Sequence, residues 1–260
     1  SNNQAIVAGN STWNLSGGTL TIGTGTATNN LFSIGAGTLI TNVTTAVIGV
    51  GAARNNQLAL NGGRLFLNNL LASNTGNRVT FSGGTLSTAR TSYSNGTDFV
   101  VGDGLQNATF QLRGGTHVFQ NNLVISTNSL LTGTGHIIVN SGAGATIIRS
   151  NATISPGASP GTLTNTGTLV WEGGGNYLWE INDFNGSIGV NPGWDLIQVI
   201  GVLSNAATTG NKFNINLTTL NGLVAGNAAN FNSENDYTLT IATATVSVAA
   251  FDATAFQVNV

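Results

Sequence analysis

Apolar and polar residues alternate in short stretches through most of this 260-residue chain. Alternation places successive side chains on opposite faces, which is typical of β-strands, and no stretch shows the apolar spacing of a helix. Up to about residue 165 the stretches are separated by Gly, Asn and Ser, which favour turns. The clearest expected strands of this part lie at 19–22, 31–34, 58–60, 64–67, 109–112, 123–125 and 136–139.

Gly-Gly pairs interrupt the alternating runs four times, at 17–18, 62–63, 83–84 and 114–115. Their spacings of 45, 21 and 31 residues fall in the range of repeat proteins, whose units cannot bury an apolar face alone. We expect each pair to mark a bend in a coiled ribbon, with inward Leu, Ile, Val and Phe stacked from coil to coil. The predicted fold class is therefore all-β: a β-solenoid resembling a parallel β-helix.

Asparagine is abundant at the expected bends, and two interpretations stay open. The amides of equivalent Asn residues could stack along the solenoid axis and bond to each other, as in ladders of identical side chains. Asn also tolerates the left-handed backbone of tight turns, which would explain its abundance without any ladder.

From Thr162 onward the expected strands become longer and richer in aromatic residues. We therefore divide the chain into a repetitive β-solenoid, residues 1–165, and a β-rich C-terminal cap region, residues 166–260, for which a sandwich-like arrangement is an alternative. A solenoid needs such a cap because its last coil otherwise exposes apolar surface and unpaired backbone. The expected strands here lie at 169–171, 177–181, 196–200, 213–217, 237–241 and 256–260.

The final alternating run places Phe256, Val258 and Val260 on one face up to the last residue. Either the natural protein continues beyond this point, which we favour, or the strand completes a sheet in a neighbouring subunit. These three residues, with Ile6 and Trp13 near the other end, are the candidates for self-association.

Composition excludes several partners. Charged residues make up 6% of the chain and the formal net charge is −2, so the clustered Lys and Arg needed to bind nucleic acid or an anionic membrane are missing. Cysteine is absent, which rules out disulfides and thiolate metal sites, and methionine is absent too. A chain without oxidisable sulfur suits an oxidising exterior. No apolar run is long enough to span a membrane, and the first residues do not form a signal peptide.

Residues 131–137, followed by the Ser-Pro-Gly-rich element at 154–163, resemble bacterial autotransporter-associated β-strand repeat proteins, and the Gly-Gly-Thr-Leu repeats are similar. The segments 229–232, 241–244 and 251–256 look like the variety that carries a PEP-CTERM sorting signal, although the sorting tail and a translocator barrel are missing. The resemblance implies a β-helix passing into a terminal β-rich region. It also implies secretion and display outside a Gram-negative-type bacterium, without implying any chemistry.

Four aromatic residues of the C-terminal region are candidates for stacking on sugars: Trp171, Tyr177, Trp179 and Trp194. The alternative, which we favour, is that they form the apolar core of the cap. The prediction of a carbohydrate-binding surface or adhesin depends on their exposure.

Carboxylates supply the candidates for catalysis or metal binding. Glu172 and Glu180 flank three glycines in an expected hairpin and would form the acid and base of a polysaccharide-degrading enzyme, if they are not simply solvated. Asp98 with Asp103 is a weaker pair, better read as turn residues. Asp183 and Asp195 could bind Ca²⁺, but they lack the spacing of a known calcium loop.

His117 and His136 are isolated among apolar and Thr neighbours, which favours structural roles over metal binding. The sequence thus predicts no catalytic, cofactor or metal site. Its leading functional interpretation is a secreted, non-catalytic structural protein of the bacterial surface or extracellular matrix, with copies of itself, and secondarily extracellular polysaccharide, as partners. It would form fibres or layers through strand edges and solenoid ends; adhesin and polysaccharide-degrading enzyme are the alternatives.

Overall fold

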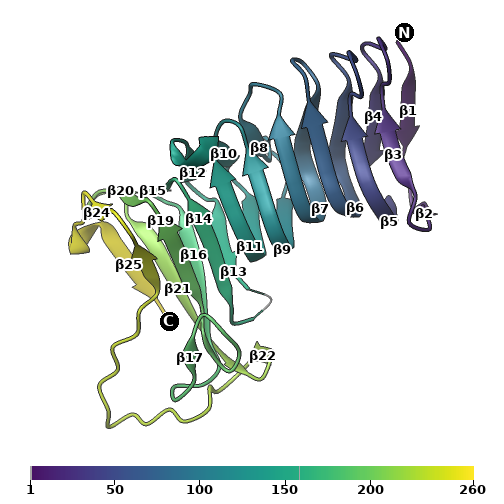
Figure 1. The fold of residues 1–260 in the computed structure, drawn as a ribbon. Helices are drawn as coiled ribbons and strands as arrows, with labels where there is room; N and C mark the ends of the chain where they lie inside the picture. Colours follow the sequence, from purple (N-terminus) through teal and green to yellow (C-terminus); the bar gives the residue numbers. More distant parts are fainter. Residues whose placement is uncertain (1, 158) are drawn as a thin grey trace.

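The protein is a β-solenoid, seen in a computed structural model that describes residues 2–157 and 159–260. Figure 1 shows an elongated stack of coils with the N-terminus at one end and the last strands at the other. Within the described residues the chain has no α-helix. The predicted fold class is confirmed.

The strands follow one another around the coils in chain order. The first coils contain β1 (Gln4–Val7), β2 (Thr12–Asn14), β3 (Thr19–Ile22), β4 (Leu31–Gly35), β5 (Leu39–Ile48), β6 (Gln57–Ser73) and β7 (Arg78–Ser94). The middle coils contain β8 (Phe99–Val101), β9 (Ala108–Phe119), β10 (Leu123–Ile125), β11 (Ser129–Val139), a 3₁₀ turn η1 (Asn140–Gly142), β12 (Ala145–Ile148), β13 (Thr153–Pro156), β14 (Thr162–Thr166) and β15 (Thr168–Glu172). The last coils contain β16 (Asn176–Ile181), β17 (Ser187–Ile188), β18 (Gly193–Trp194), β19 (Leu196–Ile200), β20 (Val202–Ala206), β21 (Phe213–Asn221), β22 (Val224–Ala225), β23 (Ala242–Ala244), β24 (Ser247–Ala249), a 3₁₀ turn η2 (Ala253–Ala255) and β25 (Phe256–Asn259).

Parallel pairing stacks these strands into three faces. The first face begins with β1, β4 and the starts of β6 and β7. The six-stranded sheet from β8 to β24 continues this face, and a hydrogen bond from Gly102 N–H to the Phe81 carbonyl (2.8 Å) joins the two parts. The second face runs from β2 to β25 and the third from β3 to β23. The long strands β5, β6, β7, β9 and β11 bend so that each serves more than one face.

Register places equivalent residues of successive coils directly above one another. On the second face, one inward column is buried from Ile40 to Tyr177, with exposures of 0–1%. At about 1.5–3 kcal/mol for each buried aliphatic or aromatic side chain, such columns supply the main stabilisation of the fold. The column contains Ile40, Leu65, Leu86, Phe110, Leu131, Ile154 and Tyr177.

The Gly-Gly pairs lie at bends, as predicted, but at two different bends of the coil. The pairs 62–63 and 83–84 stack on each other between the first and second faces, and a Cβ atom on Gly84 would collide with the Gly63 carbonyl oxygen. The pairs 17–18 and 114–115 lie between the second and third faces. Two bends on coils of unequal length explain the unequal spacing of the pairs.

Both interpretations of the asparagines are confirmed, for different residues. Asn3, Asn30, Asn56 and Asn77 form a ladder in which each side-chain amide donates to Oδ1 of the next, at 2.7–3.0 Å. Other asparagines hold left-handed turns, among them Asn55 (φ 56°), which directly precedes a ladder residue.

The parallel pairing crosses residue 165 without a change of sheet. β15 pairs with β12, and β19 pairs with β14. Residues paired on neighbouring coils are 20–28 positions apart in the first part. Asn176 and Asn214 are 38 apart because an excursion at 182–195 lies between them, and Phe213 and Phe256 are 43 apart because a second excursion leaves the coil at 222–241. Both excursions lie below the last coils in Figure 1, and they contact each other through the rings of Phe184, Phe231 and Tyr237. The division of the chain at residue 165 stays a prediction from composition.

Candidate functional site

Most of the aromatic residues predicted to bind sugars are buried. Trp171, Tyr177 and Trp179 are 3%, 0% and 2% exposed, because they point inward from the six-stranded sheet and the second face. The prediction of a stacking platform made by these three residues is therefore wrong. Trp194 is half-buried and donates its indole N–H to the Thr240 carbonyl at 3.1 Å.

The expected hairpin between Glu172 and Glu180 is also wrong. β15, which ends at Glu172, pairs with β12 and β20, whereas β16, which carries Glu180, pairs with β13 and β21 on another face. Glu172 pairs with Arg149 (3.4 Å), and Glu180 accepts a hydrogen bond from the Ser159 hydroxyl (3.1 Å). The two carboxylates thus have separate partners on separate faces.

The weaker carboxylate pair, Asp98 and Asp103, accepts hydrogen bonds from backbone groups of turns. Asp98 accepts the backbone N–H of Asn122 (3.1 Å), and Asp103 accepts that of Leu105 (2.9 Å). Both also border one shallow groove of about 360 Å³ beside Val100.

The calcium candidates are bonded to protein groups. Asp183 accepts hydrogen bonds from the Asn230 side chain (2.7 Å) and the Asn185 backbone (2.8 Å), which lower the pKa of its carboxyl. Asp195 is fully buried and holds the base of the first excursion, accepting N–H bonds from Gly161 (2.7 Å) and Glu180 (2.9 Å). Among the described residues no group of three or more His, Cys, Asp and Glu could hold a metal ion.

Burial shifts the pKa of two of these groups in directions that favour the neutral form. Removal from water raises the pKa of Asp195 to about 8, against the two backbone donors that favour its ionised form. Burial lowers the pKa of His117 to about 4. The neutral imidazole of His117 contacts the Thr91 hydroxyl (3.0 Å) and the Gly114 carbonyl (2.9 Å), so its role is structural. His136, half-buried, contacts the Thr166 hydroxyl at 2.6 Å.

The candidates for self-association lie in the two terminal coils. Ile6 points outward and is 62% exposed, whereas Trp13 and Val258 belong to the inward column of the second face. These two are 46% and 57% exposed because no further coil covers them. Val260 is fully accessible, and Phe256 packs against Trp171.

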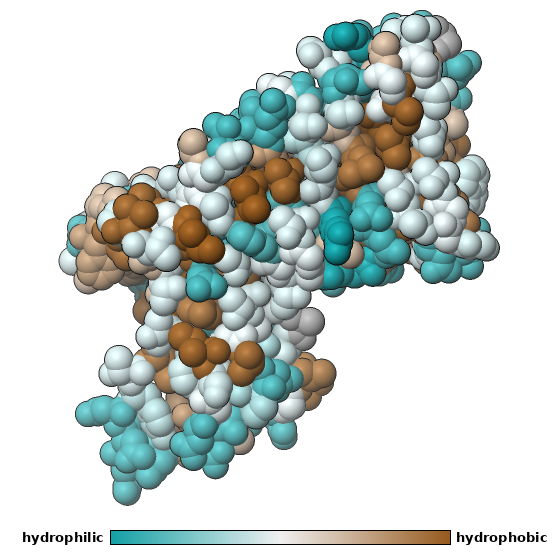
Figure 2. All heavy atoms as spheres, viewed as in Figure 1, coloured by the Kyte–Doolittle hydropathy of each residue, from teal (hydrophilic) through white to brown (hydrophobic). Residues whose placement is uncertain are grey.

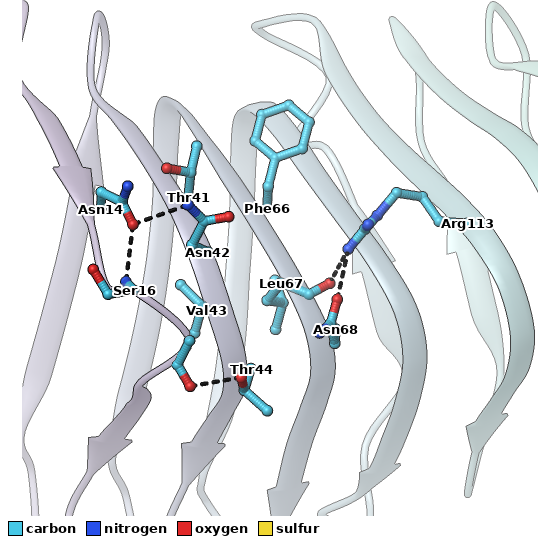
Figure 3. Close-up of a pocket in the computed structure, with 11 residues that line it drawn as sticks. Asn14, Ser16, Thr41, Asn42, Val43, Thr44, Phe66, Leu67, Asn68 and Arg113 are labelled. Atoms are coloured by element: carbon cyan, nitrogen blue, oxygen red, sulfur yellow. Dashed lines mark hydrogen bonds between the residues drawn. The ribbon is translucent and has the colours of Figure 1, made fainter.

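A polar groove of about 480 Å³ lies between the second and third faces, and the sequence did not single it out (Figure 3). One wall comes from the first two coils, where Asn42 adopts a left-handed backbone (φ 55°) and the register between β5 and β6 shifts. Asn14 Oδ1 accepts hydrogen bonds from Ser16 N–H (2.8 Å) and the Asn42 amide (2.9 Å). Thr44 donates to the Gly17 carbonyl (2.6 Å) and fixes the same wall.

The opposite wall of the groove comes from β6 and β9. Arg113 reaches from β9 past β7 and donates through Nη2 to the Leu67 carbonyl (2.5 Å) and to Asn68 Oδ1 (3.4 Å). Phe66 is half-buried and lies between this arginine and the Asn14–Asn42 pair (Figure 3), with the Arg64 guanidinium carbon 5.4 Å from its ring centroid. The groove is therefore lined by amides, one aromatic ring and the Arg113 guanidinium, with Arg64 lying against that ring, and none of the described residues that line it is a carboxylate.

One signal in the sequence could have identified part of this groove. Arg64, Phe66 and Asn68 alternate with the buried Leu65 and Leu67, so their outward direction follows from strand periodicity. Arg113 gives no such signal because its contact with Leu67 joins residues 46 positions apart.

Comparisons with family models, with curated proteins and with solved structures find no match to this chain. No helix among the described residues is both long and apolar enough to cross a membrane. The class that the fold defines is a parallel β-solenoid, and the predicted family resemblance stays a prediction.

Proposed function

We propose that this protein is a secreted, non-catalytic structural protein of a bacterial surface or extracellular matrix, and that copies associate end to end. The observation that carries the proposal is the chemistry of the two terminal coils. β1, β2 and β3 at one end, and β23, β24 and β25 at the other, each pair with strands on one side only.

None of these six strands contains a charged residue. Natural proteins commonly protect exposed strand edges with Lys, Pro or bulges, since unpaired backbone groups are a template for another strand. The low charge of the whole molecule also leaves little repulsion between copies. Figure 2 shows apolar patches among weakly polar and hydrophilic residues on the side turned to the viewer.

The two ends have matching registers. Extending the second face by one coil would set β2 of the next copy beside β25, with Trp13 over Val258 in the inward column. The last coil also leaves an apolar cavity of about 300 Å³, bordered by Trp171, whose indole N–H is buried without a partner among the described residues. A second copy stacked on this end would cover both the cavity and the edges.

Single substitutions at the ends test this arrangement. We expect the wild-type chain to form linear assemblies as its concentration rises in sedimentation velocity and electron microscopy. Val258→Lys and Trp13→Lys each place a charge in the uncovered inward column at one end, so either variant should stay monomeric or stop at short oligomers. Leu223→Lys, at a 63% exposed position in an excursion, is the control and should assemble normally.

Mixing the two end variants distinguishes head-to-tail association from other contacts. Each variant keeps one intact end, so a mixture of Val258→Lys and Trp13→Lys should form dimers that do not grow. A wild-type protein that remains monomeric at every concentration would contradict the proposal. So would assembly that Leu223→Lys weakens as much as the end variants do.

A further inference from the structure

We infer that the groove between the second and third faces binds an acidic polysaccharide, with a uronate carboxylate at Arg113 and a sugar ring against Phe66. This inference does not depend on end-to-end association, because Phe66 and Arg113 belong to β6 and β9, which are not terminal strands. Asn14, on the other wall, is the last residue of the terminal strand β2.

The charge of the groove points to an anionic ligand. The chain has seven Lys and Arg residues in total; Arg113 lines the groove with Phe66, and Arg64 lies against the Phe66 ring and borders a neighbouring groove. None of the described residues that line the groove is a carboxylate that could neutralise Arg113. A carboxylate bound here would therefore meet a net positive site on a protein whose overall formal charge is −2.

Arg113 is held in position and keeps donors for a ligand. Its Nη2 contacts to Leu67 and Asn68 fix the guanidinium at the groove wall, so little side-chain entropy remains to be lost on binding. Nη1 and Nε have no partner among the described residues. Hydrogen bonds from guanidinium to carboxylate are about twice as strong as neutral ones, and they provide the strongest single contact available in the groove.

The remaining groups fit a sugar rather than a simple anion. Aromatic rings offer an apolar face for the C–H face of a pyranose, and Phe66 lies beside the arginine. The amides of Asn14, Asn42 and Asn68 offer both donors and acceptors, as sugar hydroxyls require. A volume of about 480 Å³ lies within the usual range for small-molecule sites and accommodates short segments of a chain.

Titration calorimetry with a defined oligogalacturonate, and with its methyl ester as the uncharged counterpart, tests the inference. We expect the oligogalacturonate to bind, the methyl ester to bind at least about tenfold more weakly, and added salt to weaken only the former. Arg113→Gln should lower affinity roughly tenfold or more, with partial recovery in Arg113→Lys. Phe66→Ala should lower affinity for both ligands by roughly tenfold.

Matched controls separate the groove from general effects. Arg54→Gln removes the same charge at an exposed turn outside the groove, and Phe231→Ala removes a 59% exposed ring in an excursion. Both should bind like wild type, and circular dichroism should show that all variants are folded. Absence of binding by the wild type, equal binding of the methyl ester, or equal losses in Arg54→Gln and Arg113→Gln would each overturn the inference.

Discussion

The asparagine ladder makes the sharpest prediction about stability, because two adjacent asparagines have different roles. Asn56 is fully buried, and its side chain accepts hydrogen bonds from the Asn30 backbone (3.1 Å) and side chain (2.7 Å). It also donates to Asn77 Oδ1 (3.0 Å) and to the Ala27 carbonyl (3.2 Å). Its neighbour Asn55 is exposed and holds a left-handed turn at φ 56°.

Removal of the Asn56 side chain should therefore be costly. Four hydrogen bonds at about 1 kcal/mol each correspond to a loss of about 4 kcal/mol in the free energy of unfolding for Asn56→Ala. Asn55→Gly should change the same quantity by less than about 0.5 kcal/mol, because glycine adopts a left-handed backbone without steric cost.

Urea denaturation followed by circular dichroism measures both variants. Because each coil of a solenoid contacts only its neighbours, the Asn56→Ala loss should be concentrated in the first coils. Hydrogen exchange should then show reduced protection within 31–94 and unchanged protection within 145–220. If Asn56→Ala costs less than about 1 kcal/mol, or Asn55→Gly costs as much, the ladder does not stabilise the fold as argued.

Two further predictions concern pH and the glycine bends. Folding lowers the pKa of His117 from 6.5 to about 4, so between these pH values the unfolded chain binds a proton that the folded protein does not. The contribution of His117 to the free energy of unfolding therefore falls as the pH drops from 6.5 to about 4. Asp195, with its pKa raised from 3.8 to about 8, has the opposite effect, so its contribution falls as the pH rises through that window. The urea midpoint should therefore change little between pH 4 and 6.5 and fall between 6.5 and 8; His117→Gln should extend the fall down to pH 4, and Asp195→Asn should abolish it. Gly84→Ala should destabilise more than Gly114→Ala in thermal melts, since both have positive φ but only the first Cβ would meet the Gly63 carbonyl; equal losses would mean that backbone strain alone matters.

The sequence predicts the coil because the coil is a local property. Alternation identifies Leu65 and Leu67 as inward residues, and Gly-Gly pairs mark bends, without knowledge of any partner. The sequence could not show that the Gly-Gly pairs occupy two different bends, because this depends on how many residues of each coil lie on each face. The Trp171 and Tyr177 side chains look the same in sequence whether they line the core or the surface, and only stacking of β15 and β16 on adjacent coils buries them.

The Arg113 wall of the groove could not be predicted from the sequence for a related reason, which also shows where grooves arise in this fold. Where neighbouring coils are alike, outward side chains form flat columns that offer a ligand no depth. The groove opens where coils differ: the register between β5 and β6 shifts after Ile40, and that between β7 and β9 shifts after Thr88, beside Arg113. The regular repeat therefore builds the inward column, and the groove proposed to bind a polysaccharide lies where neighbouring coils depart from that repeat.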